Sequence, residues 1–338
     1  MDKYAEEWAE REFVGYGMEM PNPEWPNDAK VCVSFLVQYY MGAEPSFLNG
    51  DDVTCTELME IPRERFYKGR YESAEQMIEY GGREGVPRLL NIFKKHNVPV
   101  TWNLYTRAIE RNPFWVKPIL DSGAEISLGG YRYQDNLHDN ISAETQEAEI
   151  DKSLDILQKA TGNDSGPQGW FVERRTGLST KLYARAHESR GIPLVYSSDS
   201  CQDDLPYWTR SPVAADKGLL MVPFSYDTSD MRFNMRGSGW ACPSDWATYL
   251  VDTFDCFYEE AEAGEPKMMT IVLHPHVCGR PNRAIQLENF IKYAQAKGAW
   301  FATRADIAKH WQEKFPYDPA TAFGQTPVPE CGQISIPV

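Results

Sequence analysis

A histidine that directly follows an apolar run is the strongest candidate for chemistry in this sequence. Met268–Leu273 has the length and composition of a buried parallel strand, and His274 comes immediately after it. In folds built on parallel strands, chemistry takes place at the carboxyl ends of the strands. An imidazole, with an ordinary pKa of about 6.5, can transfer protons at neutral pH. We therefore predict that His274 is a general acid or base, the alternative being a hydrogen-bonded histidine of the core.

Further charged side chains follow His274 closely. His276, Arg280 and Arg283 all lie within nine residues of it. Burial at a strand end favours the neutral imidazole, and nearby arginines lower its pKa further, so we expect His274 to be neutral at pH 7. His276 is expected to point to the other side of the local chain.

The loop after the first predicted strand holds two more catalytic candidates. Glu44 could act as a base, or it could be an ordinary surface carboxylate. Tyr40 could donate a proton or a hydrogen bond, or together with Tyr39 it could simply fill space. We predict that Tyr40 and Glu44 act with His274 as the catalytic residues.

Cationic and aromatic side chains near other strand ends could bind a small substrate. Planar guanidinium groups hold anionic or ureide groups, although Arg175 could equally form an ion pair with Asp199 or Asp203. Aromatic side chains can stack on a flat ring, although packing in the core is commoner for Trp and Tyr. The predicted substrate-binding residues are Tyr80, Arg83, Trp102, Tyr133, Trp170, Arg175, Asp199 and Trp208.

The elements that must position these residues alternate along the chain. Apolar runs predict strands and periodic stretches predict helices, which together indicate an α/β fold with a parallel sheet. Seven or eight such units without a linker favour a single barrel over two domains. We expect an arm over residues 1–21, the barrel over 22–312 and a tail over 313–338. The predicted strands are 29–37, 98–104, 124–128, 169–172, 194–196, 219–223, 268–273 and 300–302, with a loop at 199–208, and the predicted helices are 84–96, 113–121, 143–161, 180–189, 244–263, 280–286 and 304–311.

Composition limits the classes of partner. The 338 residues carry a net charge of −15, which opposes binding to nucleic acid or to an anionic membrane. No apolar run approaches the roughly 20 residues of a membrane-spanning helix, and the charged amino end lacks the apolar centre of a signal peptide. Seven scattered cysteines include no C-x-x-C pair, which argues against a disulfide framework and a zinc–thiolate site. We expect a cytoplasmic protein that acts on a small molecule.

Several short and uncommon sequence motifs occur in one order, and through them the chain resembles the polysaccharide-deacetylase (NodB-homology) superfamily over about residues 20–312. Within it, the chain looks most like the branch that holds the ureide-pathway allantoinase and cyclic-imide hydrolases. The resemblance implies a distorted (β/α) barrel, hydrolysis of an amide-type C–N bond and a homo-oligomer, possibly a tetramer. The motifs are Tyr80-Gly81-Gly82-Arg83, Gly130-Tyr131-Arg132, Gly169-Trp170, Arg175-Thr176-Gly177, Asp199-Ser200, Asp203 to Trp208, Leu273-His274, Gly279-Arg280-Pro281, Asp306-Ile307-Ala308 and His310-Trp311.

The chain departs from the pattern that the resemblance implies for metal binding. Metal-dependent members carry an aspartate pair after the first strand and a His-x-x-x-His pair after the third. Here the first place reads Gln38-Tyr39-Tyr40, and Gly129 and Tyr133 stand at the second. Zinc needs about three His, Asp, Glu or Cys ligands from the protein. We therefore expect no metal and no other cofactor.

Without a metal-bound hydroxide, hydrolysis needs a protein base for the water and a donor for the oxyanion. We predict a metal-independent, allantoinase-like hydrolase of an amide, cyclic amide or ureide. Two alternatives stay open. One is a barrel recruited to lyase, isomerase or cyclase chemistry on a specialised metabolite. The other is a catalytically inactive relative that binds a ligand or a partner.

Overall fold

The structure is a computed structural model. It describes residues 13–60, 66–133, 141–162, 166–173, 176, 178–214, 216–235, 239–320 and 322.

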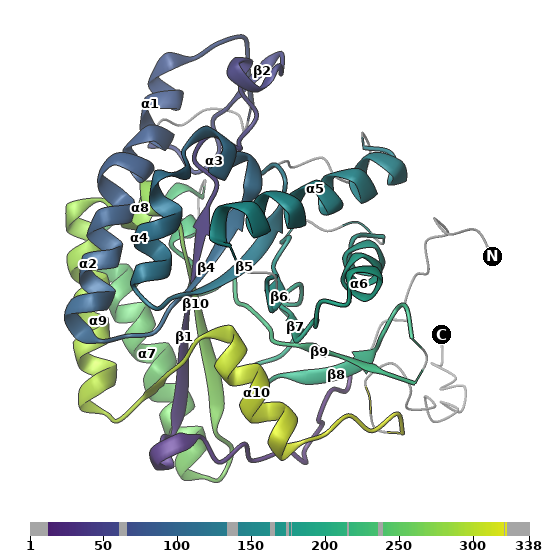
Figure 1. The fold of residues 1–338 in the computed structure, drawn as a ribbon. Coiled ribbons are helices and arrows are strands. Elements are labelled where there is room, and N and C mark those ends of the chain that lie inside the picture. The colour runs from purple at the N-terminus through teal and green to yellow at the C-terminus, as the bar shows by residue number, and fades with distance from the viewer. Residues whose placement is uncertain are drawn as a thin grey trace, which may run out of the picture.

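A curved sheet forms the centre of the molecule, and hydrogen-bonded neighbours run in the order β10-β1-β4-β5-β6-β7-β9-β8, with β11 also pairing to β1 (Figure 1). All these pairs are parallel except β8 with β9. The two ends of the path meet where the Met268 N–H donates to the carbonyl of Asp204, 3.0 Å away and just before β8. The predicted (β/α) barrel is confirmed. The strands are β1 (Val31–Tyr39), β4 (Thr101–Tyr105), β5 (Glu125–Gly130), β6 (Gly169–Trp170), β7 (Tyr196–Ser197), β8 (Tyr207–Arg210), β9 (Gly218–Met221), β10 (Lys267–Leu273) and β11 (Trp300–Phe301).

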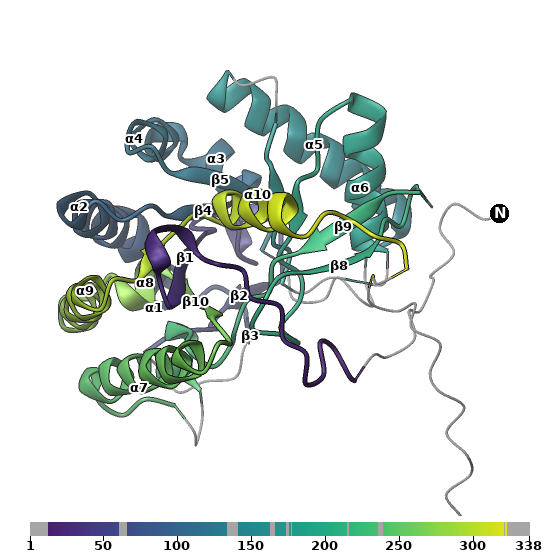
Figure 2. The ribbon, with the colours of Figure 1, turned by 90° about the horizontal axis from the view of Figure 1, so that it is seen from below.

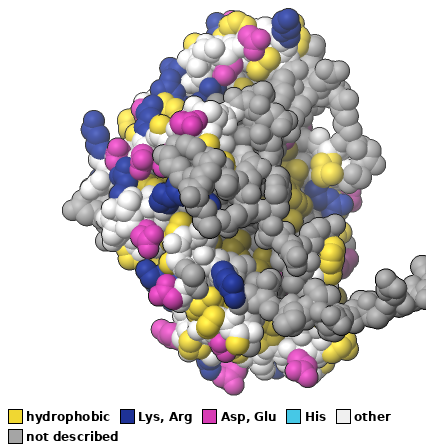
Figure 3. Space-filling model, turned by 90° about the vertical axis from the view of Figure 1, so that its right-hand side faces the viewer, with side chains coloured by type: hydrophobic (Ala, Val, Ile, Leu, Met, Phe, Trp, Pro, Cys, Tyr) yellow, Lys and Arg dark blue, Asp and Glu magenta, His cyan; other side chains and the backbone are white. Residues whose placement is uncertain are grey.

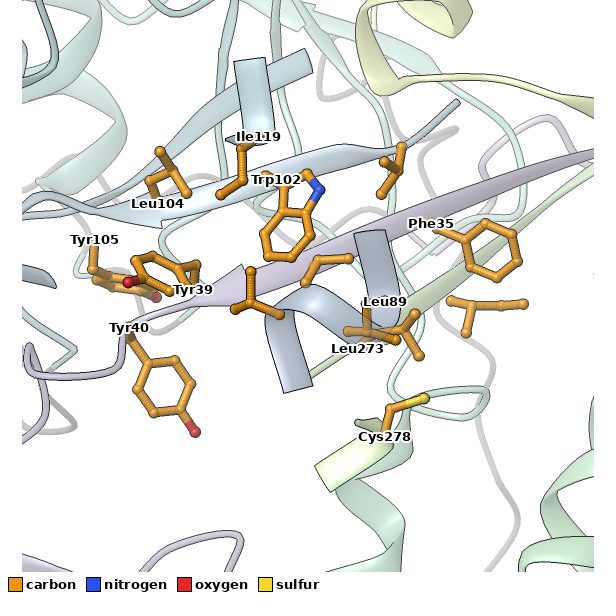
Figure 4. Close-up of a cluster of buried hydrophobic side chains, with 14 of the residues drawn as sticks. Phe35, Tyr39, Tyr40, Leu89, Trp102, Leu104, Tyr105, Ile119, Leu273 and Cys278 are labelled. Carbon is orange, nitrogen blue, oxygen red and sulfur yellow. The ribbon is translucent and has the colours of Figure 1, made fainter. Parts of the chain in front are cut away.

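The longest strands lie at the centre of the core. Every residue of β1 and β10 is buried, which explains their nearly continuous apolar sequence, because strands covered on both faces need no polar side. Trp102 of β4 packs in the same cluster beside Leu104 and Ile119 (Figure 4). These strands fix the carboxyl-terminal edge of the sheet, where His274 follows β10.

Helices surround the sheet on the outside (Figure 2). Their apolar stripes face the strands: in α2, for example, Val86, Leu89, Ile92 and Phe93 are buried. The helices are α1 (Glu72–Tyr80), α2 (Val86–His96), α3 (Thr106–Arg111), α4 (Val116–Asp121), α5 (Ala143–Thr161), α6 (Ser179–Arg190), α7 (Pro243–Glu262), α8 (Pro275–Cys278), α9 (Pro281–Ala296) and α10 (Arg304–Lys314).

Helix α10 begins at the amino-terminal ends of the strands, because the Arg304 N–H donates to Thr101 Oγ1 at the start of β4. The Arg304 side chain is fully buried. Its guanidinium donates to Ser198 Oγ (3.1 Å), Thr270 Oγ1 (2.6 Å) and the carbonyl of Pro223 (2.6 Å). Burial lowers the pKa of Arg304 to about 10. This cation fills the inside of the barrel behind the site.

Some predicted elements were wrong. The predicted loop 199–208 ends in a strand, since Tyr207 and Trp208 begin β8, the antiparallel edge of the sheet. The connection after residue 44 contains α1 and a hairpin of β2 (Val53–Cys55) and β3 (Phe66–Lys68). Helices α3 and α8 were also missed. These pieces have three to nine residues, too few for a hydrophobic period to appear in the sequence.

The segment before β1 packs against the barrel. Trp25 is buried; its indole N–H donates to the Lys267 carbonyl (3.1 Å). Its ring centroid lies 5.5 Å from that of Trp300 and 5.4 Å from that of His310. The predicted domain limits at residues 21 and 312 stay predictions. Among the described residues, no helix is both long and apolar enough to cross a bilayer.

Candidate active site at the carboxyl ends of the strands

A buried histidine–aspartate pair stands at the end of β10. His274 Nδ1 lies 2.6 Å from Asp230 Oδ1, and the backbone N–H groups of His274 and Cys278 donate to Asp230 Oδ2 at 2.8 and 3.0 Å. Asp230 begins a 3-10 helix (Asp230–Asn234) that is capped by the Ser229 hydroxyl. An ionised carboxylate only accepts hydrogen bonds, so Nδ1 carries the proton. Nε2 of His274 is therefore the nitrogen that can exchange a proton with a substrate.

The surroundings of His274 raise its pKa, whereas we predicted that they lower it. Burial lowers its pKa, but Asp230, through its charge and its hydrogen bond, and the charges of Glu173 and Glu57 act in the opposite direction. The net result is a pKa raised above its ordinary value of 6.5. The shift runs opposite to the one that we expected, because the carboxylates around His274 outweigh burial and favour the charged imidazolium. A raised pKa makes His274 a better reservoir of the proton than an ordinary histidine.

Aromatic rings form one wall of the site. Tyr40 stacks on Tyr133, with 4.0 Å between ring centroids and planes 7° apart, and Tyr105 meets both rings edge-on. Tyr40 also contacts His274 and His276 edge-to-face, at 6.1 and 5.6 Å between centroids. In Figure 4 the Tyr40 ring points away from Tyr39 and Trp102. Burial raises the pKa of Tyr40 well above its ordinary value, so its phenol keeps its proton.

His276 does not point away from the site as expected. It is buried against Tyr40 and His274, with a centroid distance of 6.2 Å between the two imidazoles. Burial, with the neighbouring charges of His274 and Arg280, lowers its pKa to about 3. His276 is therefore a neutral member of the same wall.

A chain of amide hydrogen bonds crosses the floor of the site. Asn103 Nδ2 donates to Gln38 Oε1 (2.6 Å) and to the Phe171 carbonyl (2.9 Å), while the Ser127 hydroxyl donates to Asn103 Oδ1 (2.9 Å). Gln38 Nε2 donates in turn to Glu173 Oε2, 3.2 Å away. The chain joins the ends of β1, β4 and β5 to the loop after β6. Buried amides with satisfied hydrogen bonds hold their orientation.

Comparison with known proteins places this arrangement in a family. A family model described as polysaccharide deacetylase matches residues 70–172. A putative polysaccharide deacetylase of Schizosaccharomyces pombe is 38% identical over 308 residues, which cover 88% of this chain and 94% of the relative. The chain belongs to the polysaccharide deacetylase family.

Two solved structures match most of the chain. The probable polysaccharide deacetylase of Pseudomonas aeruginosa PAO1 is 37% identical with a TM-score of 0.84, and PuuE allantoinase is 34% identical with a TM-score of 0.83. Each match covers 91% of this chain and 99% of the solved one. Deacetylases and allantoinase hydrolyse carbon–nitrogen bonds other than peptide bonds. This member of the family is a hydrolase of that class, as the sequence predicted.

The residues of this deacetylase-family barrel do not fit the metal that the family implies. In place of carboxylates after β1 stand Gln38, bound to Asn103, and the stacked Tyr40. At Gly129 a Cβ atom would lie 2.5 Å from the ring of Tyr105, so the ring occupies the space that an imidazole needs. Among the described residues, no group of three His, Cys, Asp or Glu side chains is arranged to hold a metal.

Glu44 turns toward its own loop. It is 7% exposed, and its Oε2 accepts the N–H of Gly42 at 2.6 Å. Burial raises its pKa to about 7, against the opposing effect of the backbone N–H groups and Arg132. The structure records no contact between Glu44 and His274 in the part of the chain that it describes.

Three predicted aromatic residues belong to packing contacts elsewhere. Trp102 is fully buried in the core of β4. Trp170 stacks on Tyr183 (5.0 Å between centroids) and donates its indole N–H to His187 Nε2 at 2.8 Å. Trp208 donates to the carbonyl of Phe315, 2.7 Å away, on the far side of β8.

The sequence motif Tyr80-Gly81-Gly82-Arg83 lies behind the site. The Tyr80 hydroxyl accepts from Arg88 (2.9 Å), and the Arg280 guanidinium lies 3.8 Å above the Tyr80 ring. Arg83 is exposed. Of the predicted residues, Tyr40, Tyr133 and His274 come together, and Asp199 supports the loop that carries Glu173. Arg175 lies outside the described residues.

Sequence reasoning missed the partners of His274. Asp230 lies 44 residues before it, in a turn without periodicity, and only the Ser229-Asp230 helix-start pattern marks it. Tyr105 was missed because the predicted strand stopped at residue 104, whereas β4 continues through Tyr105. Glu173 was missed because it follows directly on a predicted strand, 169–172, with no pattern of its own.

Proposed function

We propose that this chain, which is similar to an allantoinase, hydrolyses a C–N bond of a small cyclic amide or ureide without a metal-bound hydroxide. The observation that carries the proposal is the His274–Asp230 pair at 2.6 Å, at the carboxyl end of β10 and beside the tyrosine wall. In amide hydrolysis the leaving nitrogen must be protonated as the C–N bond breaks. His274 suits the role of that proton donor, because its pKa is raised and its Nδ1–H is held by Asp230.

Tyr40 supplies a second group to the proposed reaction. Its phenol keeps its proton because burial raises its pKa. A neutral hydroxyl at this position can donate a hydrogen bond to the oxyanion that forms when water adds to the carbonyl. The stacked rings of Tyr40 and Tyr133 offer a flat apolar surface against which a small ring can pack.

A hydrolysis screen tests the proposal. Purified protein, assayed for bound metal and then treated with chelator, is given allantoin and dihydrouracil, and ring opening is followed. We expect turnover that survives the chelator. Tight stoichiometric zinc with chelator-sensitive turnover would contradict the proposal. Thermal shifts with these ligands but no turnover would favour the non-hydrolytic alternatives.

A further inference from the structure

The loop after β6 holds one residue in a conformation that needs explanation. Glu173 has a φ of 64°, in the left-handed region that residues other than glycine and asparagine rarely adopt. Its N–H and that of Val172 both donate to Asp199 Oδ1, at 2.9 and 2.7 Å. Asp199 is buried at the end of β7 and is itself held by the Tyr183 hydroxyl at 3.3 Å. Backbone strain that is fixed in this way clusters at functional sites.

The Glu173 side chain is held as firmly as its backbone. Gln38 Nε2 donates to Glu173 Oε2 at 3.2 Å, and Asn103 fixes Gln38. The charge of Glu173 raises the pKa of His274 and that of Tyr40. Because Gln38 lies near the end of β1, two residues before Tyr40, its hydrogen bond places the carboxylate at the strand end that carries the predicted oxyanion donor.

We propose that Glu173 is the general base that activates water in this site, an inference that rests on the hydrolysis proposed above. Glu173 removes a proton from water as the water oxygen bonds to the substrate carbonyl carbon. The carbonyl electrons move onto its oxygen, which accepts a hydrogen bond from Tyr40. The oxyanion then re-forms the carbonyl, the C–N bond breaks, and the nitrogen takes the proton of His274 Nε2. The acid product loses its proton to water, and Glu173 returns its own proton to His274 through solvent.

The other carboxylates near His274 are less suited to this step. Asp230 orients His274 and binds the backbone at both ends of α8, and Asp199 holds the backbone of the loop after β6. Glu44 is turned toward Gly42. Glu57 is the competing candidate, because its charge also acts on His274, and its Oε2 accepts from the Tyr133 hydroxyl at 3.4 Å.

Paired substitutions distinguish the two carboxylates. With the substrate that the screen finds, Glu173→Gln is expected to lower kcat by about 10²–10⁴-fold, the usual size of a general-base effect. Its KM should stay within a few-fold of the wild-type value. Glu57→Gln should lose less than about tenfold. A larger loss in Glu57→Gln than in Glu173→Gln, or full kcat in Glu173→Gln, overturns the inference while leaving the hydrolysis itself intact. Circular-dichroism melting checks that each variant folds, and Glu173→Asp, which keeps the charge, is the second variant.

A titration decides the inference where no substrate is hydrolysed. Nitrogen-15 NMR of the imidazoles gives the pKa of His274 in the wild type and in Glu173→Gln. A clear fall in the variant, with Glu173→Asp close to wild type, supports a carboxylate that faces the acid. An unchanged His274 pKa in Glu173→Gln overturns the inference, because the carboxylate then does not share the site.

Discussion

At the scale of single residues, the charge of His274 couples the site to pH. Asp230, Glu173 and Glu57 raise its pKa above the ordinary value, against the effect of burial. A folded-state pKa above the unfolded one stabilises the protein fully below about pH 6.5, and this stability is lost as pH rises through the folded pKa. The same pH range converts the proton donor into a neutral imidazole. Activity that depends on this donor should decline on the alkaline side.

Replacing this histidine tests the proton donor. His274→Gln is expected to lower turnover by about 10²–10⁴-fold. It should also lower the free energy of unfolding by roughly 1–3 kcal/mol, because buried Asp230 loses its best donor. Steady-state kinetics and urea unfolding measure the two effects.

The control for this variant is His96→Gln. His96 lies at the end of α2, 3.1 Å from Glu288 on the outside of the barrel. Turnover in this control should equal that of wild type. His276→Gln is no control, because His276 packs against Tyr40. Full turnover in His274→Gln would assign the histidine a structural role only.

Glu44 gives a second prediction, about stability alone. Its pKa is raised by burial from an ordinary value of 4.5 to about 7. A raised carboxyl pKa stabilises the fold at low pH, and this stability is lost as pH rises from 4.5 to 7. Glu44→Gln removes the titration. Between pH 5 and pH 8 the variant should therefore gain roughly 2 kcal/mol relative to wild type. Urea unfolding that shows one constant difference at both pH values would contradict this.

At the scale of elements, a glycine-rich turn explains how α8 reaches its place. Gly81–Gly85 forms a π-helical turn between α1 and α2. A Cβ atom at Gly85 would overlap the carbonyl oxygen of Pro275, whereas one at Gly82 would lie 3.9 Å from its nearest neighbour, Met41. The glycines of this turn, Gly81 and Gly85, let the backbone of Pro275 and His276 approach it closely.

Two alanine substitutions in that turn should therefore differ. Gly85→Ala is expected to cost about 1–3 kcal/mol of unfolding free energy, as overpacked sites do. Gly82→Ala should be neutral or stabilise by up to about 1 kcal/mol, because it restricts the unfolded chain. Denaturant unfolding of both variants measures the difference. Equal stabilities would show that α8 does not pack against the turn in this way.

The elements also show where prediction from sequence stops. Strands β1, β4 and β10 were predictable because each is a buried run, and β5 has a buried centre. His274 was predictable because a strand end is marked by the sequence itself. The partner Asp230 and the tyrosine wall come from strand ends and loops that meet only when the barrel closes. No local pattern encodes such distances. In the sequence alone, an aromatic residue near a strand end looks the same whether it packs in the core, as Trp102 and Trp170 do, or binds a ligand.

At the scale of the whole molecule, the face seen in Figure 3 bears acidic and basic side chains around its margin, with hydrophobic side chains between them. The described part of the amino-terminal segment carries Phe13, Val14 and Met18, each more than 70% exposed. Apolar side chains of this size at a surface mark contact sites. We keep the prediction of a homo-oligomer, possibly a tetramer, on this basis.

Light scattering tests the assembly. A tetramer has about four times the chain mass of 38.6 kDa. Met18→Asp places a charge in the exposed apolar segment and should shift the distribution toward smaller species. A single 38.6 kDa particle at all micromolar concentrations would rule the assembly out.

The ring of Tyr105 beside Gly129 also limits how this lineage can change. A histidine at position 129 would bring a Cβ atom to 2.5 Å from that ring, so it cannot arise first without disrupting the wall. Shrinking Tyr105 first leaves a hole among stacked rings, at a cost of several kcal/mol. Both single steps are worse than either end state. An imidazole at position 129 therefore needs a paired change at position 105, and either substitution alone is expected to destabilise the wall.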